Sequence, residues 1–221
     1  MDRFDTVIFD LDGTLLNTLE DLMDAVNYAL DRYGMPQRTR NEVRCFVGNG
    51  VRLLVERSVP GGADHPRFEQ VFDAFRSYYG EHCNDKTAAY AGVLELLHRL
   101  KERGYALAIV SNKLDSAVKE LNEIYFNGIV DVAVGERDGV ARKPAPDMVE
   151  AALRELGREK ESAVYVGDSE VDVLTARNAG LFCISVLWGF RDRKFLEENG
   201  ASVFAADPVD IEKLLLNNSK F

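Results

Sequence analysis

Cysteine is scarce in this sequence. Its 221 residues include only Cys45, Cys83 and Cys183, and no two of them form a CxxC pair. An odd number of scattered cysteines predicts neither a disulfide framework nor a zinc site, so we interpret them as reduced thiols. A secretory signal and an apolar run of 18 residues are also lacking. These absences predict a cytoplasmic protein without a membrane span.

Positively charged residues are also fewer than negatively charged ones. Lysine and arginine number 27 against 37 acidic residues, which gives a net charge of −10. Such a balance argues against a general binder of nucleic acid or of anionic membranes. It also gives an anionic substrate no long-range attraction, so any anion site must be locally basic or loaded with metal. The sequence does not indicate an oligomeric state.

Two kinds of hydrophobic periodicity divide the chain. From about residue 18 to 79 the spacing is helical, with breakers at Gly34–Pro36 and Pro60–Gly62. Elsewhere short apolar runs alternate with helical patterns. The expected strands are the apolar run that begins at Thr6 and ends in Asp10-Leu11-Asp12-Gly13, then Tyr105–Val110, Val130–Val134, Ala163–Val166, Phe182–Leu187 and Ser202–Ala205. The expected helices are Val93–Arg103, Leu114–Ile124, Asp147–Leu156, Val171–Asn178, Lys194–Asn199 and Val209–Leu216.

This alternation predicts an α/β fold with a doubly wound parallel sheet covered by helices on both faces. The first strand stands alone before the helical stretch. We therefore expect a core formed by residues 1–15 and 86–221, interrupted by a helical domain at 16–85.

The most informative motif ends the first strand. Asp10 and Asp12 are followed by Gly13, and residues two apart on an extended segment point the same way. Two carboxylates this close need a cation or a shared proton. A calcium loop is excluded because Ile8 and Leu19 occupy positions that should carry ligands. A solvated Asp-Gly turn stays open as an alternative.

Three later segments place polar residues beside strand ends or helix starts. Ser111 follows an apolar run and suits a phosphate oxygen, although a helix N-cap is the simpler interpretation. Lys143 precedes Pro144 as either a fixed cation or a solvated lysine. Asp168 and Asp172 lie one helical turn apart and suit magnesium, whereas capping of the following helix by Asp168 or Ser169 is the alternative.

Taken together in this order, the four segments resemble the haloacid dehalogenase superfamily, specifically its phosphatases. The resemblance covers the whole chain and implies a Rossmann-like core with an inserted α-helical cap domain. It implies that Asp10 is the nucleophile, forming an aspartyl-phosphate, and that Asp12 is the acid and base. Ser111 and Lys143 complete the implied catalytic set.

The same resemblance implies a bound Mg²⁺ and a substrate pocket. The implied metal ligands are Asp10, the carbonyl of Asp12, and Asp168, with Asp172 as a further ligand or a supporting partner. The implied substrate-binding residues in the core are Gly13, Thr14, Asn112 and Lys113. One departure is Asn17, where members of the family often have an acidic residue at the hinge into the cap.

The most informative segment of the helical insertion is Phe46–Arg52, which contains Gly48-Asn49-Gly50 followed by Val51 and Arg52. Glycines before a helix permit close approach to a ligand, and Arg52 could face a carboxylate. A tight turn with a solvated arginine is equally compatible. The segment resembles the phosphoglycolate phosphatase branch, as does Ser111–Lys113, so Asn49, Gly50 and Arg52 are added to the expected substrate-binding residues.

The sequence thus predicts a Mg²⁺-dependent phosphatase of small phosphomonoesters, foremost 2-phosphoglycolate. Alternatives with the same core are a nucleotidase, a pyrophosphatase, a sugar-phosphate phosphatase and a phosphomutase. A phosphorylation-sensing protein is the alternative from another class, because receiver domains also use a phosphorylated aspartate with Ser or Thr and Lys-Pro. Neither nucleic acid nor a membrane is an expected partner.

Overall fold

The computed structural model describes residues 4–216. It separates into two compact units, one formed by the chain up to Leu15 and from Ala89 onward, the other by Leu16–Ala88. Among the residues described, no helix combines the length and the apolar character needed to cross a bilayer.

The first unit is built on a six-stranded sheet in the order β5-β4-β1-β6-β7-β8, with parallel pairing throughout. Its strands are β1 (Thr6–Phe9), β4 (Ala106–Leu114), β5 (Val132–Glu136), β6 (Ala163–Gly167), β7 (Phe182–Val186) and β8 (Phe204–Ala205). The four residues of β1 are fully buried because helices cover both faces of the sheet. This confirms the predicted fold class.

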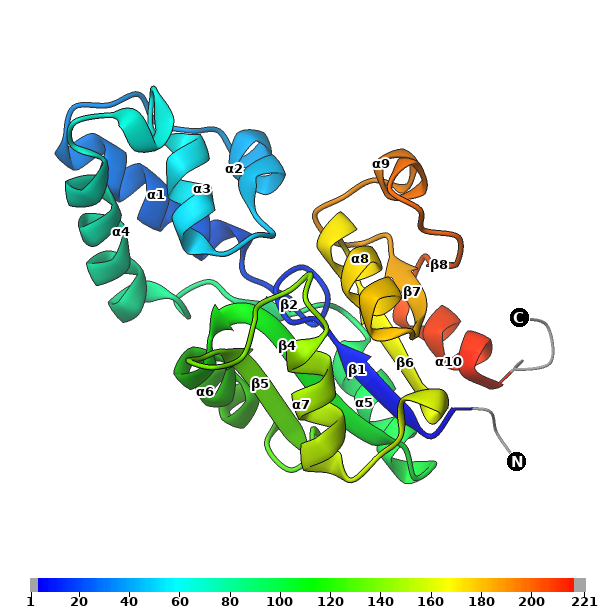
Figure 1. Ribbon diagram of the computed structural model, residues 1–221. Helices are drawn as coiled ribbons and strands as arrows, with labels where there is room; N and C mark the ends of the chain where they lie inside the picture. Colours follow the sequence, from blue (N-terminus) through cyan, green and yellow to red (C-terminus); the bar gives the residue numbers. More distant parts are fainter. Residues whose placement is uncertain (1–3, 217–221) are drawn as a thin grey trace. The chain divides into compact units, whose positions relative to one another are not determined.

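Helices fill both layers around the sheet. They are α5 (Val93–Glu102), α6 (Asp115–Phe126), α7 (Asp147–Leu156), α8 (Glu170–Ala179), α9 (Arg193–Glu198) and α10 (Pro208–Leu216), with a 3₁₀ turn at Lys160–Ser162. In Figure 1, α7 and α8 lie on the near face of the sheet and α5 lies behind it. The near layer buries a cluster that includes Ile8, Val110, Met148, Tyr165 and Ala176.

Two expectations about the elements were wrong in detail. The strand expected to end at Val110 continues as β4 to Leu114, so Ser111, Asn112 and Lys113 lie in extended backbone, and α6 begins only at Asp115. The pairing of β4 with β5 shifts register between Val110 and Leu114. Two short strands, β2 (Leu16–Asn17) and β3 (Ala88–Ala89), were not expected and pair with each other.

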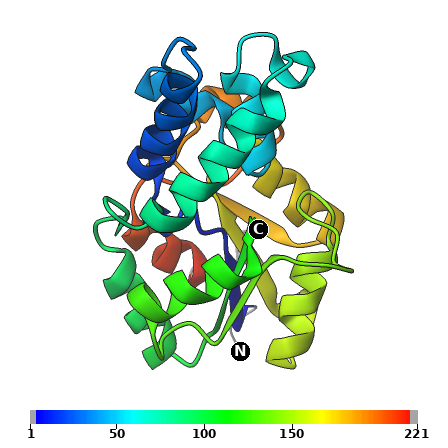
Figure 2. The ribbon, with the colours of Figure 1, turned by 90° about the vertical axis from the view of Figure 1, so that its left-hand side faces the viewer.

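The second unit is helical, with α1 (Leu19–Arg32), α2 (Arg40–Phe46), α3 (Val51–Ser58), a 3₁₀ turn at Gly62–Asp64 and α4 (Phe68–His82). Figure 2 shows α1 alongside α4, and these two helices pack together. The buried carboxylate of Asp21 accepts hydrogen bonds from the backbone N–H groups of Lys86 and Thr87 and from the Thr87 hydroxyl, at 2.7–3.2 Å. Asn17 accepts a long bond of 3.4 Å from the Leu19 N–H, next to the start of α1.

Candidate active site

The strand order brings the predicted acids together. β1 lies between β4 and β6, so the three strands end side by side at their carboxyl ends. Asp10 follows β1, Ser111 lies near the end of β4, and Asp168 follows β6. This edge is where open α/β sheets hold ligands. Lys143 reaches it from the loop that precedes α7.

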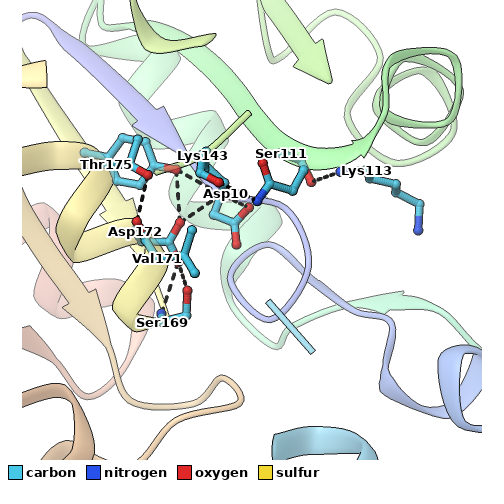
Figure 3. Close-up of polar contacts among 10 residues, drawn as sticks. Asp10, Ser111, Lys113, Lys143, Ser169, Val171, Asp172 and Thr175 are labelled. Atoms are coloured by element: carbon cyan, nitrogen blue, oxygen red, sulfur yellow. Dashed lines mark hydrogen bonds and ion pairs between the residues drawn. The ribbon is translucent and has the colours of Figure 1, made fainter. Parts of the chain in front are cut away.

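Lys143 is the centre of a buried hydrogen-bond network (Figure 3). Its Nζ donates to Asp10 Oδ1 at 2.7 Å, to Asp172 Oδ1 at 2.8 Å and to the Tyr165 hydroxyl at 3.1 Å. Burial by itself would lower the pKa of Lys143, but the charges of Asp10 and Asp172 outweigh burial and raise the pKa well above its usual value. The ammonium group is therefore a fixed positive charge beside Asp10, and the alternative of a solvated lysine is wrong.

The acids themselves are crowded. Ligand oxygens of Asp10, Asp168 and Asp172 all lie within 4.8 Å of one another. Burial and then the charge of Asp172 raise the pKa of Asp168 to about 7. The same two causes raise the pKa of Asp10 well above its usual value, although Lys143 opposes them. Carboxylates that resist ionisation in this way are relieved by a divalent cation, and an all-oxygen donor set suits Mg²⁺.

Asp172 has less room for a metal than its distances suggest. Its Oδ1 accepts from Lys143 and from the Tyr165 hydroxyl, the latter at 3.1 Å. Its Oδ2 accepts from the backbone N–H of Ser169 at 3.1 Å and from the Ser169 hydroxyl at 2.6 Å. A carboxylate offers about four lone-pair positions, and these four donors occupy them. Asp10 and Asp168 are therefore the better pair to hold a metal.

A second buried lysine, Lys113, lies near Asp12 of the nucleophile motif. Lys113 Nζ is 3.6 Å from Asp12 Oδ1, and the lysine side chain is only 6% exposed. The backbone N–H of Lys113 donates to Ser111 Oγ at 3.2 Å, and Asn112 Nδ2 donates to the Lys143 carbonyl at 3.1 Å. This segment therefore connects Asp12 and the Lys143 loop through β4.

Among the described residues of this region, three polar atoms are buried without a hydrogen-bond partner: Asp12 Oδ1, Thr14 Oγ1 and Asn112 Oδ1. Buried polar groups in proteins are nearly always hydrogen-bonded, so such atoms point to a ligand or to ordered water.

Gly13 is required by the backbone and by its close neighbours. It has φ of +90°, and a Cβ there would lie closer than 3.0 Å to the Asp168 carboxylate and the Phe190 ring.

Three of the predicted site residues belong to the helical unit. Gly50, with φ of +83°, precedes α3, and Asn49 stands just before it. Arg52 is exposed and forms an ion pair with Glu69. Its guanidinium also stacks over the rings of Phe68 and Phe72, at 5.0 and 5.1 Å from their centroids. Within this unit Arg52 is therefore held by neighbours on α4, which differs from a freely solvated side chain.

Comparison with known proteins agrees with this geometry. Residues 7–186 match the sequence pattern of the haloacid dehalogenase-like hydrolases. The chain belongs to this family. A phosphoglycolate phosphatase of Aquifex aeolicus is 33% identical over 213 residues, which cover 96% of this chain and 97% of that protein. Another phosphoglycolate phosphatase, from Mesorhizobium japonicum, is 32% identical and covers 93% of both chains.

A solved structure supports the same placement among the haloacid dehalogenase-like hydrolases. The crystal structure of a protein from Lactobacillus delbrueckii subsp. bulgaricus, described as a candidate phosphoglycolate phosphatase, superposes with a TM-score of 0.92. The two sequences are 36% identical, over 97% of this chain and 99% of the other. The predicted superfamily and its phosphoglycolate phosphatase-like branch are confirmed.

Some residues of the site were not predicted. Tyr165 was assigned only to a buried strand, yet its hydroxyl bridges Lys143 and Asp172. Ser169 was considered as a helix cap, and its N–H and hydroxyl hold Asp172. The sequence predicts no role for the segment after β7. A usable signal was present at Tyr165, because a tyrosine buried in a central strand needs a partner for its hydroxyl.

Proposed function

We propose that this chain is a Mg²⁺-dependent phosphatase that hydrolyses small phosphomonoesters through an aspartyl-phosphate, with 2-phosphoglycolate as its substrate. The observation that carries the proposal is the contact of Lys143 with Asp10, within a cluster of the Asp10, Asp168 and Asp172 carboxylates at the ends of β1 and β6. The names of the full-length relatives support the substrate.

Asp10 is the nucleophile. One of its carboxylate oxygens attacks phosphorus while the bond from phosphorus to the ester oxygen breaks, and Asp12 gives its proton to the departing alkoxide. Asp12 then takes a proton from a water molecule, whose oxygen attacks the phosphorus of the aspartyl-phosphate. This releases inorganic phosphate and restores Asp10. Lys143 and Ser111 stay in place and stabilise the phosphoryl oxygens, because phosphoryl transfer depends mostly on positioning and charge neutralisation.

Asp10 and Asp168 would hold Mg²⁺, together with the carbonyl oxygen of Asp12. The bound ion supplies positive charge that allows a phosphate dianion to approach the carboxylates. Asp172 has the supporting role, because its four lone-pair positions are taken by Lys143, Tyr165 and Ser169. It also holds the Lys143 ammonium group, which contacts Asp10 as well.

Recognition of a carboxylate on the substrate falls to Lys113 in the core. Asp12 protonates the leaving group, so a cation 3.6 Å from Asp12 lies on the leaving-group side of phosphorus. In phosphoglycolate the carboxylate is one carbon away from the ester oxygen, within reach of such a cation. Arg52, Asn49 and Gly50 remain proposed contacts from the helical unit. For Arg52 this requires exchanging Glu69 for the substrate.

The test is Mg²⁺-dependent phosphate release from 2-phosphoglycolate, nucleoside monophosphates, pyrophosphate, sugar phosphates and an aryl phosphate. A kcat/KM for phosphoglycolate at least about tenfold above the others, or ~1.4 kcal/mol, supports the named substrate. A flat profile keeps the chemistry and refutes the substrate. Transfer without net release would favour a mutase, and a long-lived phosphoprotein would favour a sensor. Asp10→Asn is the control for contaminating phosphatases.

The roles of Lys113 and Arg52 are distinguished by comparing two substrates. 2-Phosphoglycolate carries a carboxylate, and the aryl phosphate does not. Lys113→Met should lower kcat/KM for phosphoglycolate by about tenfold more than for the aryl phosphate, as for a lost charged hydrogen bond. Arg52→Ala tests the helical unit in the same way, with the exposed Arg40→Ala as its matched control. Equal losses on both substrates would remove the substituted residue from carboxylate recognition.

A further inference from the structure

The segment that follows β7 crosses the two loops that carry the acids. This strap, Trp188–Arg191, follows Leu187 and precedes α9. Trp188 Nε1 donates to the Thr14 carbonyl at 3.0 Å, which ties the strap to the nucleophile motif. The backbone N–H of Phe190 donates to Asp168 Oδ2 at 2.6 Å, which ties it to the second acid.

Gly189, between these two anchors, lies where no side chain fits. A Cβ at this position would be closer than 3.0 Å to the Asp168 side chain and to the Gly13 carbonyl oxygen. Real Cβ atoms essentially never approach this closely, so the backbone of the strap lies directly against Asp168. The glycine is needed for space.

The far end of the strap is fixed as well. Arg191 Nε donates to Glu170 Oε2 at 2.9 Å, and its guanidinium lies 5.5 Å from the centre of the Phe195 ring. Glu170 is the first residue of α8, two positions after Asp168. Both ends of the strap are therefore attached to elements that carry or adjoin the acids.

We propose that Trp188–Arg191 is a positioning strap for Asp168, the acid that would bind the metal with Asp10. The Phe190 N–H engages Oδ2 and fixes the orientation of the carboxylate, which would leave Oδ1 as the ligand for the metal. Hydrogen-bond partners of this kind preorganise metal ligands and commonly change metal affinity by about 10–100-fold when removed. The inference rests on the metal part of the proposed function and is independent of the substrate.

The test is the affinity of the metal-free protein for Mg²⁺ alone, measured by calorimetry and by competition with Mn²⁺ followed by electron paramagnetic resonance. Gly189→Ala should raise the Kd for Mg²⁺ about 10–100-fold. The Mg²⁺ concentration for half-maximal activity should rise in parallel, while kcat at saturating Mg²⁺ stays within about threefold. Gly80→Ala is the matched control, because a Cβ at Gly80 meets nothing within 4 Å.

A second variant covers the case in which Gly189→Ala fails to fold. Trp188→Phe keeps the aromatic ring and removes the N–H that reaches Thr14, so it should raise the Kd about threefold or more, as for one lost hydrogen bond. Mg²⁺ affinity equal to wild type in a folded Gly189→Ala protein overturns the proposal, as does equal affinity in Trp188→Phe if the first variant is unfolded. A wild type that binds neither ion refutes the metal part of the proposed function and the strap with it.

Discussion

Removing one oxygen atom from the centre of the site tests the Lys143 network directly. Tyr165→Phe deletes the hydroxyl that accepts from Lys143 Nζ and donates to Asp172 Oδ1, both at 3.1 Å. The ring is fully buried and would stay in place, so no large cavity forms. Burial raises the pKa of Tyr165 well above its usual value, so the hydroxyl is a donor at every working pH.

The expected cost follows from these two contacts. Hydrogen bonds to charged groups contribute about 1.5–3 kcal/mol each, and bonds of 3.1 Å belong at the weak end of that range. Without the hydroxyl, Lys143 keeps two carboxylate acceptors, and the oxygen of Asp172 keeps Lys143. We therefore expect the free energy of unfolding to fall by ~2–3 kcal/mol. For a chain of this size, that loss lowers the melting temperature by roughly 4–12 °C.

The chain offers a convenient probe for this measurement. Trp188 is its single tryptophan and lies in the same unit as Tyr165, so urea unfolding followed by tryptophan fluorescence reports on that unit. The matched control is Tyr28→Phe, whose hydroxyl is exposed and accepts only from Arg32 at 3.2 Å among the contacts described. The control should change stability by less than about 0.5 kcal/mol.

Turnover provides a second readout of the same substitution. Lys143 is less firmly placed without the hydroxyl, so kcat should fall by up to about tenfold while KM changes little. A Tyr165→Phe protein as stable and as active as Tyr28→Phe would refute the view that the hydroxyl is part of a working network. A loss of stability alone would restrict Tyr165 to a structural role.

Two further predictions concern the acids. Asp10→Asn should abolish turnover because an amide is a poor nucleophile, and Asp12→Asn should slow kcat by about 10²–10⁴-fold through loss of the acid and base; rates equal to wild type would remove either residue from its role. The pKa of Asp168, about 7 without metal, predicts that Mg²⁺ binds about tenfold more tightly at pH 8 than at pH 6. The same raised pKa means that the folded state keeps a proton that the unfolded state releases, so metal-free protein should lose stability as pH rises from about 4 to 7. Calorimetric Mg²⁺ titrations and urea unfolding across this range check both, and a flat profile would contradict them.

Much of the core could be predicted because burial leaves a simple pattern in the sequence. β1 is covered on both faces, so its four residues Thr6–Phe9 form an almost continuous apolar run. The helices between the strands are amphipathic, and α7 was predicted with the bounds Asp147–Leu156 that the structure has. β2 and β3 are two residues long. A strand that short has no periodicity to detect, because its pairing depends on contacts between distant segments.

The end of β4 shows why boundaries near the site were harder to predict. Ser111, Asn112 and Lys113 are polar, and polar residues after an apolar run normally indicate that a strand has ended. Here the extended backbone continues, and all three residues are buried. Contacts specific to the site hold this segment, such as the bond from Asn112 to the Lys143 carbonyl, 31 residues away. Local sequence preferences contain no trace of such a contact.

Asp168 and Asp172 show how two competing interpretations of one motif can each hold for a different residue. The motif suited both a metal site and a helix cap formed by Asp168 or Ser169, and Ser169 is the N-cap of α8. In the structure, Asp172 accepts from the N–H and hydroxyl of Ser169 at the start of α8, as a capping acid does, and uses its other oxygen for Lys143. Asp168 has one oxygen engaged by Phe190 and lies near Asp10. The two acids differ in role because different numbers of their oxygens already accept hydrogen bonds. Some of the donors are Lys143, Tyr165 and the strap Trp188–Arg191, which reach the motif from other parts of the chain.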